Sequence, residues 1–206
     1  MSKDMLGSVI RAAVGVPQDR MDVLAKIASA MAADNPAGEA WHARFKEQLK
    51  EGLLSSKFAA DAIIRVDRSV RPSYPDWVKM VMHPKLEPTG PAEYDITKVK
   101  QWLHDGQKNG KWVKGEKLYA HLKETDSLKT CLGLSDLEEI QKKGIAFFRK
   151  HFQHSKAVFA WKSVVRNSDG SLLVPYLCED GDEVVVDWNW LDNDWYDSNP
   201  ALRFAS

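Results

Sequence analysis

The stretch AVFAWKSVVRNSDGSLLVPYLCEDGDEVVVDWNW, residues 157–190, decides the fold class. It contains three runs rich in valine, leucine and aromatic residues, at 157–166, 171–178 and 183–190. The connections NSDG and EDGD between them are typical of tight β-turns. The stretch therefore predicts a three-stranded antiparallel meander. Pro175 lacks a backbone donor in the middle run, so we expect a bulge or an edge position there.

The last run alternates in a way that assigns each residue to one face of its strand. The face expected to cover a core carries Val184, Val186, Trp188 and Trp190. After this run comes the acidic aromatic loop, DNDWYD at residues 192–197. Rigid aromatic side chains with polar neighbours are typical interface anchors, although the loop could instead tuck against its own domain. The residues expected to contact a partner protein are Asp192, Asp194, Trp195, Tyr196 and Asp197.

Helical signals dominate the segment before these strands. Apolar spacing and capping residues predict helices over about 95–103, 115–128 and 135–154. The third begins with a capping-box pattern at residues 135–138, and Gly144 weakens it only slightly. We expect these helices to pack on one face of the sheet, which makes the fold class α+β.

The N-terminal part has a different pattern. Residues 5–54 predict a helical hairpin, whose second helix carries one apolar stripe. Five of the nine prolines then fall within residues 72–91, which predicts a proline-rich connection, with a short helix at 76–82. We expect two domains, a helical one at 1–70 and an α+β one at 71–206.

Composition limits the class of protein. The chain has 206 residues, 44% hydrophobic and 28% charged, which is typical of globular domains. Two cysteines, Cys131 and Cys178, are too few for a disulfide framework or a four-thiolate zinc site. Neither a signal peptide nor a membrane-spanning run is visible, so we expect a cytoplasmic protein without a membrane partner.

The charge is unevenly distributed along the chain, although the net charge is zero. Residues 101–170 hold 13 Lys and Arg against 8 Asp and Glu, and residues 171–206 hold one against 8. Lysines that contact phosphates and aromatic rings that stack on bases would make the basic part a nucleic-acid site, or these lysines could simply form a solvated face. The absence of arginine from residues 98–123 argues against such a site. The residues expected to bind nucleic acid are Lys98, Lys100, Trp102, Lys108, Lys111, Trp112, Lys114, Lys117 and Lys123.

Catalytic and cofactor signatures are weak. The sequence has no nucleophile-elbow, zinc-protease, P-loop or dinucleotide motif, so no cofactor and no metal are expected. His151 and His154 are three residues apart, which is not enough for a zinc site. A cleft that brings His104 or His121 to Cys131 or a carboxylate would favour an enzyme of unknown class.

Long strings of the chain resemble a family of uncharacterised bacterial proteins from metagenomic and candidate-phylum genomes. The strings are YPDWVKMVMHPKLEPTGPAEYDITKVKQWLHDGQKNGKWVKGEKLYAHLK, CLGLSDLEEIQKKGIAFFRKHF and PALRFAS, within residues 74–206. This resemblance implies no activity, ligand or catalytic residue. Our leading hypothesis is a non-enzymatic interaction module, with nucleic-acid binding as the alternative, and the oligomeric state stays open.

Overall fold

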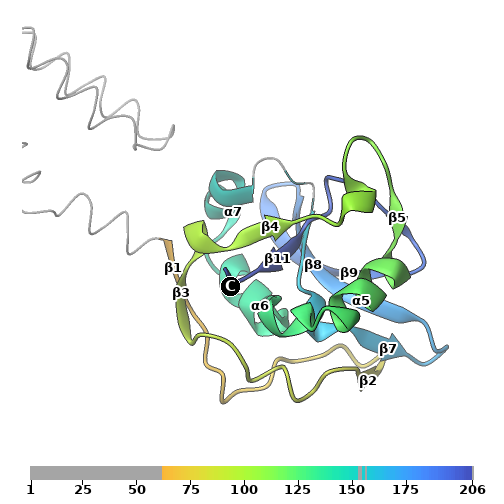
Figure 1. Ribbon diagram of the computed structural model, residues 1–206. Coiled ribbons are helices and arrows are strands. Elements are labelled where there is room, and N and C mark those ends of the chain that lie inside the picture. The colour runs from red at the N-terminus through yellow and green to blue at the C-terminus, as the bar shows by residue number, and fades with distance from the viewer. Residues whose placement is uncertain (1–61, 153–154, 156, 206) are drawn as a thin grey trace, which may run out of the picture. The chain divides into compact units, whose positions relative to one another are not determined.

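The computed structural model describes residues 62–152, 155 and 157–205, and the predicted N-terminal hairpin lies outside this part. The described part is an α+β fold with three α-helices, a mixed seven-stranded sheet and two small sheets (Figure 1). Its helices are α5 (Gly115–Glu124), α6 (Leu134–Gln141) and α7 (Ile145–Phe152), with 3₁₀ turns η2 (Ile96–Lys98), η3 (Asp105–Gln107), η4 (Ser127–Thr130) and η5 (Trp161–Ser163). Its strands are β1 (Ile63–Arg65), β2 (Val78–Val81), β3 (Glu93–Asp95), β4 (Lys100–Trp102), β5 (Val113–Lys114), β6 (Ala157–Phe159), β7 (Val165–Asn167), β8 (Leu172–Asp180), β9 (Glu183–Trp190), β10 (Asp194–Trp195) and β11 (Ala201–Arg203).

The main sheet has the order β2-β7-β8-β6-β11-β4, and β9 pairs with the other side of β8. Only the β6–β11 pairing is parallel. The structure does not show the predicted three-stranded meander. The run 157–166 is broken by η5 into β6 and β7, which both pair with β8. Short strands distant in sequence, β2, β4 and β11, then extend the sheet on both sides.

Pro175 sits inside β8 without a bulge, opposite Trp188 in a continuous register with β9. Its carbonyl accepts a hydrogen bond of 3.0 Å from the backbone N–H of Ala160, on the side away from β9. On this side the neighbouring strand β6 ends and the chain turns away through η5. No described strand there needs a backbone N–H from position 175, so the lack of this donor in proline hardly destabilises the sheet. The expected bulge or edge position is therefore wrong, because the break lies in the neighbouring strand.

Apolar cores lie on both faces of the sheet, and the expectation of helices on one face is wrong. Neighbouring strand residues alternate between them: Val158 belongs to the core that contains α6 and α7 residues, and Phe159 to the core that contains α5 residues.

Three of the predicted helices have a different structure. The helix expected over 135–154 is divided into α6 and α7, because Gly144 adopts φ +80°, a conformation that interrupts a helix. The segments expected as helices at 95–103 and 76–82 instead contain β4 and β2, each held as an edge strand of the main sheet. Of the helices predicted within the described residues, the one expected at 115–128 is confirmed, as α5 with a shorter C-terminus.

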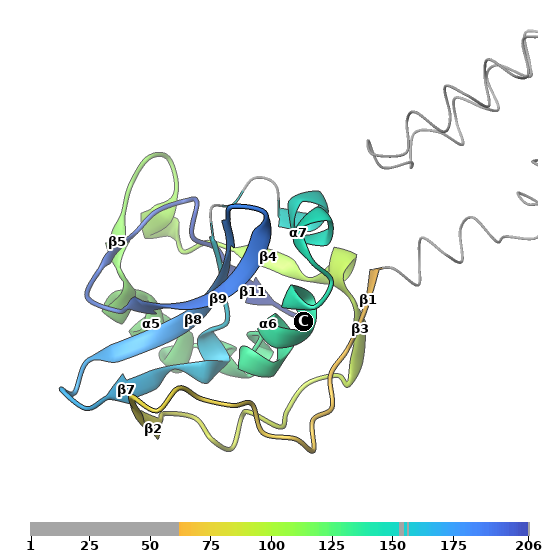
Figure 2. The same cartoon turned by 180° about the vertical axis from the view of Figure 1, so that it is seen from behind.

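The segment between β1 and β3, residues 66–92, is here called the strap and contains the proline-rich connection. Because β1 and β3 pair with each other, the strap starts and ends at the same place. Between these points it reaches the far edge of the main sheet, where β2 pairs with β7 (Figures 1 and 2).

The tryptophans of β9 do not all face a core. Val184 is buried, and Trp188 is half-buried against Tyr74 and Trp77 of the strap. Trp190 is 48% exposed, so its expected core position is wrong. The periodicity identified the correct face of the strand, but the strand continues past the elements that cover that face.

Candidate functional site

The pairing of β4 with β11 brings cationic and aromatic side chains together at one edge of the main sheet. Lys100 lies opposite Arg203, and Trp102 opposite Ala201, so Lys100, Trp102 and Arg203 share one face. The guanidinium carbon of Arg203 lies 5.3 Å from the centre of the Trp102 ring. The Nε of Arg203 donates to Thr130 Oγ1 at 3.1 Å, which fixes the guanidinium in this position.

Two histidines complete this arrangement. The His121 ring, from α5, stacks on Trp102 with 5.7 Å between ring centres and 10° between planes. The His104 ring lies 4.9 Å from His121, nearly perpendicular to it. Lys117 precedes His121 by one turn of α5 and therefore lies on the same side of the helix. We call this set the basic aromatic cluster: Lys100, Trp102, His104, Lys117, His121 and Arg203.

The cluster has an excess of positive charge. No ion pair is formed by Lys100, Lys117 or Arg203 with any described residue. The pKa of His104 is lowered, first by burial and then by the nearby charges of His121 and Lys117. The arrangement is therefore suited to an anion, which would offset charges that the protein itself leaves unbalanced.

The residues expected to bind nucleic acid are divided among several places. Lys100, Trp102 and Lys117 belong to the cluster, while Lys108 pairs with Asp105 at 2.8 Å. Lys123 lies over the Tyr119 ring, 4.3 Å from its centre. The others, outside the cluster, are Lys98 and Lys111, which are exposed, Trp112, which is 53% exposed, and Lys114, which pairs with the acidic aromatic loop. Arg203 was not among the predicted binding residues, because it joins the cluster through the pairing of β11 with β4. His104 and His121 lie within the basic segment itself, but the sequence analysis considered them only as possible catalytic groups.

The acidic aromatic loop is partly buried. Trp195 is fully buried against Phe159 and Trp161, with ring centres 4.2 and 4.9 Å away. A Cβ on Gly115 would lie 2.7 Å from the backbone oxygen of Leu191 and also meet the Trp195 indole, so this packing requires glycine.

The loop also uses part of its charge within the molecule. Asp194 pairs with Lys114 at 2.8 Å, and the backbone carbonyl of Asp192 accepts from the same lysine. The side chains of Asp192 and Asp197 are exposed, and Tyr196 is 45% exposed. The basic and acidic parts of the chain thus neutralise each other at Lys114, and the remaining exposed groups of the loop are two carboxylates, the Asn193 amide and one phenol.

A second polar set lies where the strap packs against α6 and η5. We call it the buried polar network: Arg68, Glu87, Asp136, Lys162 and Ser163. Arg68 donates to both carboxylate oxygens of Asp136, at 2.6 and 3.1 Å, and Asp136 has no exposed surface.

The other members of the network join the strap to η5. Ser163 donates to Glu87 at 2.7 Å and accepts from the backbone N–H of Leu134. Lys162 donates to the backbone carbonyl of Thr89 at 2.9 Å. Burial raises the pKa of Glu87 and lowers that of Lys162. Every member has a protein partner, so the network holds the strap in place.

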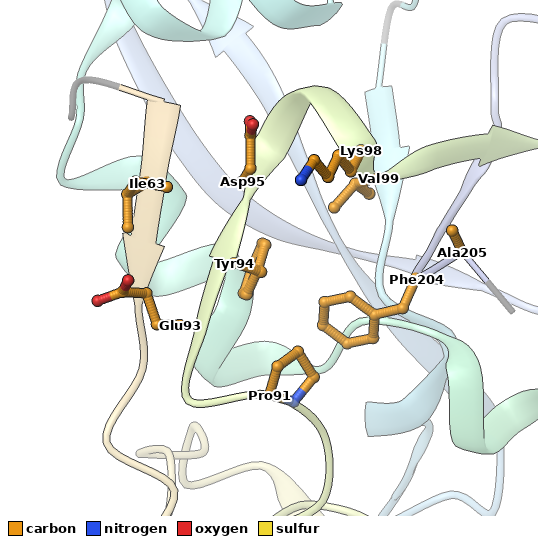
Figure 3. A pocket seen from close by; sticks show the side chains of 9 residues that line it. All are labelled: Ile63, Pro91, Glu93, Tyr94, Asp95, Lys98, Val99, Phe204 and Ala205. Carbon is orange, nitrogen blue, oxygen red and sulfur yellow. The ribbon is translucent and has the colours of Figure 1, made fainter. Parts of the chain in front are cut away.

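A surface pocket of about 450 Å³ lies beside β3 and the C-terminal residues (Figure 3). Tyr94 and Phe204 form its aromatic wall, edge to face with 5.0 Å between ring centres. Of its two carboxylates, Glu93 pairs with Arg65 and Asp95 caps η2 by accepting from Thr97. Lys98 lines the pocket as well.

Nucleophilic and metal chemistry find little support in the described residues. Cys131 is buried, and burial raises the pKa of its thiol to about 12, which keeps it protonated. Within residues 62–152, 155 and 157–205, no group of three or more metal-ligating side chains gathers. The described helices include none that is long and apolar enough to cross a membrane.

Comparison with protein-family models, curated proteins and solved structures finds no match to this chain. The geometry of the site therefore carries the functional argument, and the resemblance to a bacterial family stays a prediction.

Proposed function

We propose that the chain is a binding module for single-stranded nucleic acid and that the basic aromatic cluster is its contact surface. The observation that carries this proposal is the Trp102 stack. The Trp102 indole contacts an arginine and a histidine, and two further lysines lie beside it. Neither these lysines nor the arginine forms an ion pair with any described residue. Lysine and arginine contact phosphates, and aromatic or guanidinium planes stack on unpaired bases.

A single strand fits this surface better than a duplex. The cations come from an edge strand, from the end of β11 and from one side of α5, so the described part of the chain offers no long basic helix for the major groove. Trp112, which is 53% exposed, is a further stacking surface in the connection between β4 and α5. The sequence argument against this site was the absence of arginine, and Arg203 supplies one from another strand.

The test is binding of a labelled single-stranded oligonucleotide, measured by fluorescence anisotropy at two salt concentrations. With about three phosphate contacts, affinity should fall roughly tenfold to twentyfold between about 50 and about 200 mM salt. Lys100→Ala should weaken binding and lower the salt slope by about 0.7.

Lys79→Ala is the matched control for this variant. Both lysines are exposed and lie on edge strands, but β2 and β4 are at opposite ends of the sheet. The proposal predicts that Lys79→Ala binds like the unaltered protein. Absence of binding at low salt, or equal losses in the two variants, would contradict it.

Protein binding through the acidic aromatic loop is the second candidate function. It is supported by the 45% exposure of Tyr196 between two exposed carboxylates, Asp192 and Asp197. Its partner would carry a basic surface. Tyr196→Ala with Asp197→Asn should abolish capture of such a partner while leaving oligonucleotide binding intact, which separates the two candidates.

A further inference from the structure

Strand β9 forms one edge of the main sheet within the described part of the chain. All eight of its residues pair with β8 in a register without a bulge, and no described strand pairs with its outer side. Proteins commonly protect such an edge by keeping it short or by placing lysine, proline or a bulge in it. β9 has none of these features, so its outer side is suited to pair with a further strand.

The direction of the backbone groups in β9 follows from Pro175. The Pro175 carbonyl accepts from Ala160, on the side away from β9, so Pro175 and the opposite residue Trp188 form a pair without mutual hydrogen bonds. The backbone N–H and C=O of Trp188 therefore point away from β8. Because this direction alternates along a strand, the same holds for Val184, Val186 and Trp190.

Some of these outward groups already have partners. The first and last carbonyls of the set accept hydrogen bonds from Gln141 and Asn193, at 2.9 and 3.3 Å. The N–H of Trp188 donates to the Asp187 side chain at 2.7 Å. The N–H and C=O of Val186 bond to no described residue, and neither does the C=O of Trp188. The middle of the edge therefore offers one donor and two acceptors to an added strand.

The two faces of β9 differ in their chemistry. Val186, Trp188 and Trp190 lie on one face, and Trp190 is 48% exposed. Glu183 and Asp187 lie on the other face, where both are exposed and neither forms an ion pair with a described residue. Directly opposite residues of paired strands share a face. An added strand would therefore meet apolar side chains at every second residue and carboxylates at the residues between.

We propose that the edge of β9 binds an extended segment of another protein in which apolar residues alternate with lysine or arginine. The segment adds an antiparallel strand, with its apolar side chains on Trp188 and Trp190 and its cations beside Asp187 and Glu183. A second copy of β9 fits the edge less well, because its own carboxylates would lie on the same face as those of the first copy. This site is separate from the basic aromatic cluster and does not depend on oligonucleotide binding.

The experiment measures fluorescence anisotropy of a labelled peptide of about eight residues, with blocked ends, in which valine alternates with lysine. The protein is the whole chain of 206 residues. The control is the same peptide methylated on its valine nitrogens, which keeps the charge but removes the donor opposite Val186. We expect the first peptide to bind at least roughly tenfold more tightly than the methylated one. A peptide that alternates valine and glutamate should not bind.

Variants of the protein test the edge itself. Val186→Pro removes an outward donor and keeps the bonds between β9 and β8, so it should weaken peptide binding roughly tenfold with little change in the unfolding midpoint. Asp187→Asn should weaken binding roughly threefold. Glu124→Gln is the control for the loss of one charge, since it removes an exposed carboxylate of α5, and it should leave binding unchanged.

Amide exchange gives a measurement that relies on no variant. The N–H of Val185 points to β8, whereas that of Val186 points outwards. Bound peptide should therefore slow deuterium exchange at Val186, while Val185 stays protected with and without it.

Peptide binding that is lost on methylation and that protects Val186 supports docking on this edge. Equal binding of the two valine–lysine peptides, or binding without protection at Val186, would show a charge contact alone and overturn it. Self-association that Val186→Pro abolishes would assign the edge to a second copy, and absence of peptide binding would leave it without an occupant; both overturn it as well. The oligonucleotide affinity of Val186→Pro should match that of the unaltered protein, so the two surfaces are tested separately.

Discussion

The basic aromatic cluster and the buried polar network both contain an arginine, a lysine and further polar groups, but they treat positive charge in opposite ways. In the network, Arg68 meets a carboxylate and Lys162 a backbone carbonyl. In the cluster, Arg203 is fixed by a threonine hydroxyl and an aromatic ring, and its terminal nitrogens bond to no described residue.

The difference separates cations that hold the fold together from cations that can serve a ligand. A buried ion pair is costly to break, because one partner is left charged and without compensation. An exposed cation without a carboxylate contributes little to stability and is free to contact an anion. Substitutions in the buried polar network should therefore mainly lower the stability of the fold. Substitutions in the basic aromatic cluster should mainly weaken binding of the oligonucleotide.

The largest effect is expected from Asp136→Ala. It leaves the largely buried Arg68 without its carboxylate and removes a negative charge that favours the charged form of Lys162, so the free energy of unfolding should fall by about 3–5 kcal/mol. Urea denaturation measures this value. Glu93→Ala is the matched control, since it removes the exposed partner of Arg65 and should cost under about 1 kcal/mol. Similar losses in the two variants would contradict the comparison.

Trp195→Ala should be nearly as destabilising, by about 3–5 kcal/mol, because it removes a fully buried indole between Phe159 and Trp161. Trp190→Ala, an exposed position, should change stability far less. Thermal unfolding of both variants tests this difference. A Trp195 variant with unchanged stability would mean that the acidic aromatic loop is not part of the core.

Arg203→Ala should have its main effect on binding. Loss of the guanidinium contact should weaken oligonucleotide affinity roughly tenfold, about 1.4 kcal/mol, and change unfolding much less. Anisotropy and denaturation of the same preparation give both values. If the larger effect were on stability, Arg203 would belong with the structural cations.

Glu87 should make stability depend on pH. Burial raises the pKa of its carboxyl in the folded protein. Its contribution to the free energy of unfolding is therefore fully present below the pKa of the unfolded chain, about 4.5, and is lost as the pH rises through the pKa of the folded protein. Glu87→Gln keeps the acceptor for Ser163 and cannot ionise, so it should flatten this decline. Denaturation midpoints between about pH 4 and about pH 8 measure it, and an unchanged decline would exclude Glu87 as the source.

The smallest effect is expected from Lys114→Ala. This lysine lies at the surface and contacts Asp194 and the carbonyl of Asp192, so its loss should hardly change the unfolding midpoint. It should, however, make the acidic aromatic loop more negative and lower affinity for an oligonucleotide slightly.

The parts of the fold that could be predicted from sequence have strong local signals. β9 has strict alternation and a glycine turn at Gly181 before it, and α5 has a clear apolar stripe. By contrast, β2 and β4 have only 4 and 3 residues. Their conformation comes from the strands beside them, and helix-like spacing in so short a run is not informative.

The sequence predicted some of the residues of the site, but not how the fold brings them together. Lysines and tryptophans near residue 100 were visible in the sequence, and three of them belong to the cluster. Arg203 reaches them through a pairing between strands about a hundred residues apart, which no local pattern indicates. Trp195 shows the reverse case, since a loop with acidic neighbours contributes a core residue once β10 pairs with β5.

The strap described above also has a consequence for the order of folding. Its ends meet at β1 and β3, and its anchors are side chains of η5 and α6, so those elements must form before it can dock. Few of its backbone amides belong to a ladder, since β2 is its sole strand. We therefore expect its amides to exchange with deuterium through local opening well before those of β8, and its peptide bonds to be cut by a protease before those of β8.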